Sequence, residues 1–174
     1  MVPSSYNAFF TAIATGAAAL IGLLFVAVSV RDDTIFGPKA VPGGEALAIT
    51  AFTGLVNSLL IALLALIPQD NLGYGAVILA VVSIWSIVQL HNQLHWARST
   101  FLLSFAVAAY LLQLGYGIAL LVKPHDSNSV NNIAYVLFAT LVFSLQRAWS
   151  LLRGKHIEEA ARAASSGPGP HTGG

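Results

Sequence analysis

Two histidines, His91 and His95, are the residues of this sequence whose type and spacing best suit chemistry. They are four residues apart, so on a helix both imidazoles project from the same face. Imidazole nitrogens combined with carboxylate oxygens form a workable ligand set for zinc or non-haem iron. The membrane topology that the rest of the chain indicates would bring three carboxylates to the same side: Asp32, Asp33 and Glu45. These five residues are the candidate metal ligands.

The histidine pair also has a simpler interpretation. The sequence contains no His-Glu-x-x-His motif and none of the repeated His boxes of membrane di-iron desaturases. A polar helix end in the lipid headgroup region would use the same residue types. We therefore expect His91 and His95 to lie at a hydrated helix end in the headgroup region. We expect no cofactor and no catalytic activity, and metal binding is the alternative.

A second group of polar side chains lies inside segments that are otherwise apolar. Its members are hydroxyl and amide residues: Thr50, Thr53, Asn57, Ser83, Ser86 and Gln113. Such side chains either hydrogen-bond neighbouring membrane helices or line a hydrophilic path. We expect interhelical bonding, because a bundle buries a few amides easily. The alternative is a pore formed by several copies of the chain.

Small residues recur at helical spacing in two of the apolar segments. The first segment contains the pairs Ala12/Gly16 and Ala18/Gly22, and the fourth contains Gly115. Small side chains let helix backbones approach closely where lipid surrounds them. We expect these residues to pack helices within one bundle, and the alternative is a contact between copies.

The distribution of charged residues along the chain indicates which class of protein contains these candidate residues. All fifteen Lys, Arg, Asp and Glu residues lie outside five apolar runs, at 8–30, 46–67, 74–90, 101–122 and 133–145. Hydrophobic residues make up 56% of the chain and charged residues 9%, against roughly 45–50% and 25% in soluble domains. An ionised group at mid-membrane costs about 2.5–3.5 kcal/mol. The pattern therefore predicts a membrane protein and disfavours ion-coupled transport.

Composition also excludes several kinds of site. The chain has no Cys, so disulfides, thiolate metal sites and Cys nucleophiles are excluded. The net charge of +1 with scattered basic residues provides no surface for nucleic acid. The first run, with 23 residues, is longer than a signal-peptide core, so we expect it to be retained.

About 20 apolar residues span a bilayer, and the runs predict five transmembrane helices. The predicted spans are about 8–30, 46–67, 74–90, 101–122 and 132–152. The fifth includes Arg147, which we expect to snorkel to the interface. Residues 1–7 form an outer segment and 8–153 the membrane domain. Residues 154–174 form a cytoplasmic tail that starts at the break expected at Gly154 and is disordered from about 165.

Basic residues orient the five helices. With the N-terminus outside, seven of the eight Lys and Arg residues lie on the inner side, and only Lys123 lies outside. Inner loops of membrane proteins carry such an excess. The sequence therefore predicts an N-out, C-in topology.

Two segments resemble sequences of small, uncharacterised multi-pass membrane proteins of actinobacterial type. They are the first helix with its exit, Phe9–Ser29, and two parts of the second helix, Ala51–Asn57 and Leu63–Pro68. The resemblance covers roughly the first seventy residues. It implies a bacterial membrane protein and no particular activity.

We thus expect an all-α, polytopic bundle of five helices in the bacterial plasma membrane. The expected function is non-enzymatic, as a scaffold or an accessory subunit of a membrane complex. The expected partners are the lipid bilayer and either further copies of the chain or another subunit, and no nucleic acid. The alternatives are a homo-oligomeric channel and a metal-dependent membrane enzyme or sensor.

Overall fold

The computed structural model describes residues 2–30, 44–68, 72–93, 100–124 and 126–165, and within the helices it describes no side chains at 44–47, 90–93, 100–103 and 151–165. A short turn, η1 (Ser4–Tyr6), leads into the first long helix. The long helices are α1 (Asn7–Val30), α3 (Gly44–Leu66), α4 (Leu72–Gln93), α5 (Thr100–Val122) and α6 (Ser127–Ser165). Each is long and apolar enough to cross a membrane. The prediction of an all-α bundle with five such helices is confirmed.

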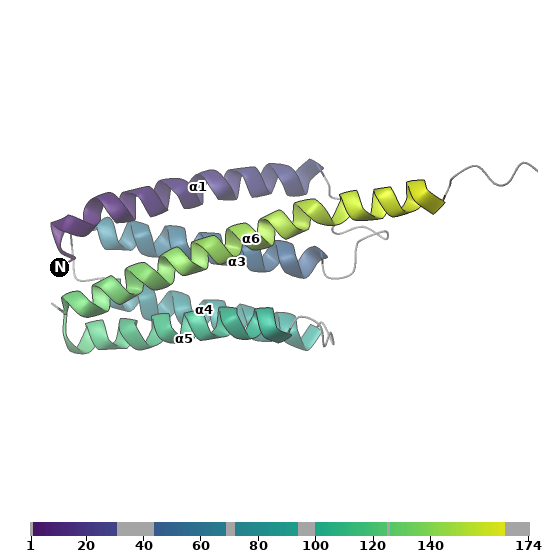
Figure 1. Cartoon of the computed structure of the whole chain (residues 1–174). Helices are drawn as coiled ribbons and strands as arrows, with labels where there is room; N and C mark the ends of the chain where they lie inside the picture. The colour runs from purple at the N-terminus through teal and green to yellow at the C-terminus, as the bar shows by residue number, and fades with distance from the viewer. Residues whose placement is uncertain (1, 31–43, 69–71, 94–99, 125, 166–174) are drawn as a thin grey trace, which may run out of the picture.

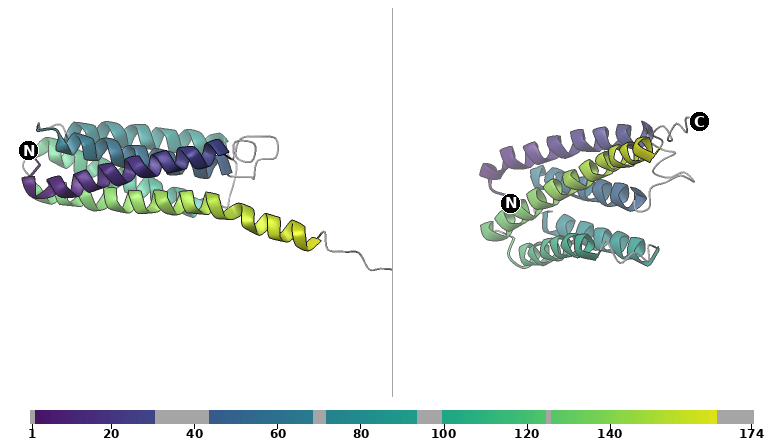
Figure 2. Two further views of the ribbon diagram at one scale, coloured as in Figure 1. Left: turned by 90° about the horizontal axis from the view of Figure 1, so that it is seen from above. Right: turned by 45° about the vertical axis from the view of Figure 1, so that its right-hand side comes forward.

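The helices run up and down along one axis. The start of α1, the end of α3, the start of α4, the end of α5 and the start of α6 lie at one end of the bundle (Figure 1). Helices α3 and α6 are central: α3 contacts α1, α4 and α6, and α6 contacts α1, α3 and α5. The last part of α6 extends beyond the other helices (Figure 2). Helix α1 is the least buried of the five candidate spans.

The interior contains small and large apolar side chains from every long helix. The main core cluster includes the fully or nearly fully buried Phe10, Ile61, Leu72, Leu120 and Ile133, one from each helix. Many large apolar side chains face outward instead, as lipid-facing positions do. The five helices therefore bury a narrow core and present an apolar outer surface.

Glycines set the closest approaches between helices. A Cβ at Gly54 on α3 would overlap the Ser144 hydroxyl on α6. A Cβ at Gly117 on α5 would lie 3.1 Å from the Ala76 Cβ on α4. Glycine at these two positions lets the helix backbones come together, as small residues do in membrane bundles.

Helix α6 differs from the predicted fifth span at both ends. It begins at Ser127 because Asp126 caps it, accepting hydrogen bonds from the backbone N–H groups of Asn128 (3.3 Å) and Ser129 (3.1 Å). It also continues through Gly154 to Ser165, so the break expected at Gly154 is not observed. One glycine costs a helix only about 1 kcal/mol relative to Ala, and strong helix formers surround it. The predicted disorder beyond 165 falls on residues outside the described ranges.

Candidate functional site

A reciprocal amide pair lies in the middle of the bundle. Asn57 on α3 donates its Nδ2–H to Gln113 Oε1 on α5 at 2.9 Å, and Gln113 Nε2 donates to Asn57 Oδ1 at 3.3 Å. The Gln113 amide also donates to the Ala76 carbonyl on α4 at 3.1 Å. Both amide side chains are buried. This amide cluster ties three helices together and pairs the groups that would otherwise line a polar path.

A small cavity of about 20 Å³ lies between α3, α4, α5 and α6, and several of the residues around it carry hydroxyl groups. That volume is room for about one water molecule. Three predicted residues, Thr50, Thr53 and Ser86, line this cavity, which we call the hydroxyl cavity. The other polar members are Tyr110, Thr140 and Ser144. Ser83, the remaining predicted hydroxyl, is buried and interacts with the Tyr110 hydroxyl.

The structure thus brings the six predicted polar residues into one interior band. Asn57 and Gln113 form the amide cluster, and the four hydroxyl residues lie at or beside the hydroxyl cavity. Sequence reasoning did not identify Tyr110, Thr140 or Ser144. Spacing offered one signal for the last two, because Thr140, Ser144 and Arg147 follow one another at i, i+4 and i+7 on a single helix face.

Several hydroxyl donors bond within their own helices. Thr140 Oγ1 donates to the Val136 carbonyl at 2.8 Å, and Ser58 Oγ donates to the Gly54 carbonyl at 2.9 Å. Such bonds to the carbonyl four residues earlier are usual for Ser and Thr in apolar helices. They satisfy the hydroxyl donors within the same helix.

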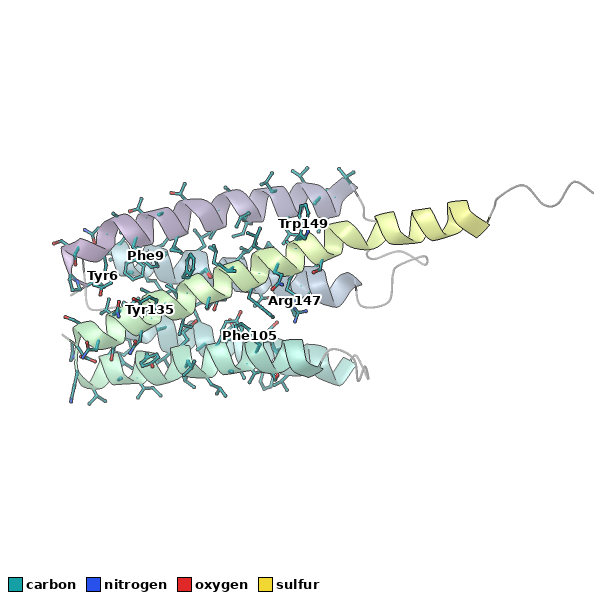
Figure 3. All side chains as sticks on the ribbon, viewed as in Figure 1. Tyr6, Phe9, Phe105, Tyr135, Arg147 and Trp149 are labelled. Atoms are coloured by element: carbon teal, nitrogen blue, oxygen red, sulfur yellow. The ribbon has the colours of Figure 1, made fainter. Side chains whose placement is uncertain are left out.

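Arg147 lies on α6 one turn beyond the hydroxyl cavity, and its position corrects a prediction. The side chain is 5% exposed and does not snorkel outward. Its guanidinium carbon lies 4.8 Å from the centre of the Phe143 ring, and that ring packs at 4.8 Å from Phe105 of α5. Figure 3 shows Arg147 and Phe105 toward the end of the bundle opposite Tyr6. Burial follows from the helix face, because Arg147 shares the face of the interior residues Thr140 and Ser144.

Two guanidinium nitrogens of Arg147 are unsatisfied. Nε and Nη2 are buried and have no hydrogen-bond partner among the described residues. These two nitrogens form one edge of the planar guanidinium group, the edge that matches a pair of carboxylate or phosphate oxygens. A buried donor without a partner is costly, and a charged one more so.

A second hollow, of about 220 Å³, lies between α1 and α3 and has an apolar lining. We call it the α1/α3 groove, and it is lined by Leu24, Phe25, Val28, Ala48, Ile49 and Phe52. Ile49 also lines the hydroxyl cavity. Ala148, next to Arg147, packs against the small core cluster that contains Leu24. The groove and Arg147 are therefore at the same end of the bundle.

The predicted helix-packing residues do not pack inside the bundle. Ala12, Ala18, Gly22 and Gly115 are exposed, and Gly16 is half-buried. A Cβ at any of these three glycines would meet no atom within 4 Å. The tight contacts involve other glycines instead, among them Gly54 and Gly117. Periodicity alone could not separate the two sets, because in an apolar helix both the inner and the outer face are apolar.

The candidate metal ligands lie largely outside the described part of the chain. Asp32, Asp33 and His95 are in undescribed segments, and for His91 on α4 and Glu45 on α3 only the helix is described. Among side chains that the structure does describe, no three His, Asp or Glu residues converge. Metal binding at His91 and His95 therefore stays a prediction.

Comparison with known proteins adds no relative. Neither a protein family nor a curated protein nor a solved structure matches this chain.

Proposed function

We propose that this chain is a non-catalytic scaffold of the bacterial plasma membrane, which self-associates through the outward face of α1. The observation that carries the proposal is the run of small residues along that face. Its members are all exposed and recur at helical spacing: Ala8, Ala12, Thr15, Ala19 and Gly22. We call this set the α1 outer face.

Contact with lipid does not require small residues, whereas close approach of another helix does. The bundle's own close contacts involve other glycines, such as Gly54 and Gly117, whereas all five residues of the α1 outer face are exposed. Thr15 donates its hydroxyl to the Thr11 carbonyl at 2.9 Å, so this polar group needs no external partner. The surface therefore suits an apolar helix.

A second copy of the chain is the partner that we infer. Closed two-fold pairs are the commonest symmetric assemblies, and they use the same patch on both subunits. Small-xxx-small faces in membranes pair readily with identical faces. Two α1 helices crossing near Ala19 would bury both faces at once.

The interior of the bundle supports a scaffold over a channel formed by one chain. The Asn57 and Gln113 amides, which lie near the middle of their helices, bond to each other. Their donors and acceptors are then satisfied within the chain. A pore through one bundle would have to break this pair.

We further propose that the N-terminus lies outside and the C-terminus in the cytoplasm, because seven of the eight basic residues are then inside. In this orientation the end of α6 projects from the inner side of the bundle (Figure 2). This extension gives the scaffold a cytoplasmic helix for contact with other subunits.

Single-cysteine cross-linking tests the self-association, because the natural chain has no Cys. Ala19→Cys should form a disulfide-linked dimer in native membranes under mild oxidation. Ala139→Cys, an exposed position on α6, is the matched control and should stay monomeric. Adding Gly22→Leu to Ala19→Cys should abolish the dimer. Equal cross-linking at both cysteine positions, or none at Ala19→Cys, would overturn the proposal.

A further inference from the structure

Arg147 is a buried cation, and no described residue accepts a hydrogen bond from two of its guanidinium nitrogens. Its Nε and Nη2 atoms are the two unsatisfied buried side-chain atoms found in the described part of the chain. Burial at 5% exposure denies the cation most of its water. The Phe143 ring face offers some compensation, but it cannot accept two in-plane N–H donors.

The geometry of the two free nitrogens specifies the kind of ligand. Nε–H and one Nη2–H point in parallel from the same edge of the guanidinium group. Two oxygens on one phosphorus or carbon atom accept such a pair of bonds, and a single-atom anion accepts them less well. The Phe143 ring, which packs against Phe105 at an interplanar angle of 38°, covers one face of the guanidinium group. An oxyanion with two geminal oxygens is the complementary group.

The bilayer supplies such an oxyanion at this depth. Arg147 lies three residues before the end of the candidate span Ser127–Ser150. The ends of membrane spans approach the headgroup region, where the lipid phosphates lie. Basic pockets between membrane helices on the cytoplasmic side are known binding sites for anionic lipid head groups. We propose that Arg147 binds the phosphate of one anionic phospholipid through Nε and Nη2, and in the orientation proposed above this lipid comes from the inner leaflet.

The α1/α3 groove favours a lipid over free phosphate as the source of the anion. It is apolar, it lies at the same end of the bundle as Arg147, and it shares Ile49 with the hydroxyl cavity. Two of its lining side chains, Phe25 and Phe52, are also exposed at the outer surface of the bundle. An acyl chain fits this lining, whereas inorganic phosphate would gain nothing from it.

The test is lipid retention by the purified full-length chain. The protein is incubated in detergent with equal amounts of phosphatidylglycerol and phosphatidylcholine, and the bound lipid is counted by native mass spectrometry. The wild type should retain one phosphatidylglycerol per chain. Arg147→Met should lower that retention at least tenfold, while Lys123→Met, which removes an exposed cation at the other end, should leave it unchanged.

Two further experiments test whether the bound phosphate belongs to a lipid and whether the shape of the guanidinium group matters. Excess inorganic phosphate should not displace the lipid, and displacement would overturn the lipid assignment. Arg147→Lys keeps the charge but lacks the two-pronged edge, so retention should fall clearly below that of the wild type. Retention in Arg147→Met or Arg147→Lys equal to wild type would overturn the site itself.

A second measurement distinguishes loss of lipid binding from misfolding of the variants. Phosphatidylglycerol nanodiscs should raise the Tm of the wild type relative to phosphatidylcholine nanodiscs, because a ligand of the folded state stabilises it. Arg147→Met should show no such difference in Tm while still unfolding cooperatively. An equal lipid-dependent shift in both proteins would contradict the proposal. Cross-linking through α1 should be the same in wild type and Arg147→Met. A failure of lipid binding at Arg147 can therefore be distinguished from a failure of self-association through α1.

Discussion

Asn57 and Gln113 exchange hydrogen bonds in both directions across the centre of the bundle, although 56 residues separate them in sequence. Gln113 also reaches the Ala76 carbonyl, so the pair connects α3, α4 and α5. Unlike apolar contacts, which lipid could replace, this pairing has a defined partner and direction. It therefore fixes how the three helices are rotated against one another.

The amide pair predicts a coupled effect on stability. Gln113→Leu should destabilise the bundle more than Asn57→Leu, because it removes three hydrogen bonds and leaves Asn57 without a partner. The coupling energy in a double-mutant cycle should be about 0.6–1.7 kcal/mol, between the mean and the largest value measured for hydrogen bonds in a membrane protein. Unfolding by SDS in mixed micelles measures it. Additive effects of the two substitutions would show that the pair is not a unit.

The contact of Gly54 with Ser144 predicts a steric effect. Gly54→Ala should cost about 1–3 kcal/mol, the usual range for overpacking, because the added Cβ overlaps the Ser144 hydroxyl. Adding Ser144→Ala removes that oxygen and should recover part of the loss. Gly115→Ala is the matched control, since its Cβ would meet no atom within 4 Å. If both glycine substitutions were equally tolerated, the close approach of α3 and α6 would be contradicted.

The cap of α6 predicts a dependence on pH. The Ser129 hydroxyl donates to the Asp126 carboxylate, and this bond, with the backbone N–H bonds of Ser129 and Asn128, lowers the pKa of Asp126. A lowered folded-state pKa means that the ionised cap stabilises α6 at neutral pH. The contribution persists above the unfolded pKa of about 3.9 and is lost as pH falls through the lower folded value.

Asp126→Ala should therefore unfold more easily than wild type at pH 7, and the difference should shrink at low pH. Thermal unfolding followed by circular dichroism between neutral and acidic pH measures both. A difference that is constant with pH would exclude the ionised cap as its cause. Ser127→Ala, at the exposed neighbouring position, serves as the control.

The proposed orientation predicts which end of the chain is accessible from outside. In the cysteine-free chain, Ser5→Cys in η1 should react with a membrane-impermeant maleimide on intact cells. Ser165→Cys, at the end of α6, should react only after the cells are permeabilised. The opposite pattern would reverse the topology.

The sequence predicted the number of helices well, because each span must be a long apolar run. It also placed Asn57 and Gln113 near the middle of their spans, and we therefore expected such residues to form hydrogen bonds between helices. It could not predict which residues pair, because pairing depends on how each helix is rotated. The continuous α6 was missed because a glycine usually weakens a helix without ending it.

The sequence was less able to predict which residues of each helix face the interior and which face outward. In a soluble helix, polar residues identify the outer face, but most residues around α1 are apolar or small, so the type of residue at Gly22 did not indicate that it faces outward. Arg147 was expected at the surface because a cation usually reaches water. Arg147 lies on the same face of α6 as Thr140 and Ser144. This spacing predicts its burial only when the structure has shown that this face packs against the other helices.

The number of copies per assembly in a lipid bilayer tests the proposed scaffold most directly. Single-molecule photobleaching of the labelled chain, reconstituted at low protein-to-lipid ratio, counts the copies. The α1 outer face predicts two copies for wild type and one for Gly22→Leu, with Gly115→Leu as an exposed control that stays dimeric. A wild-type chain that is monomeric, or a dimer that survives Gly22→Leu unchanged, would contradict self-association through α1.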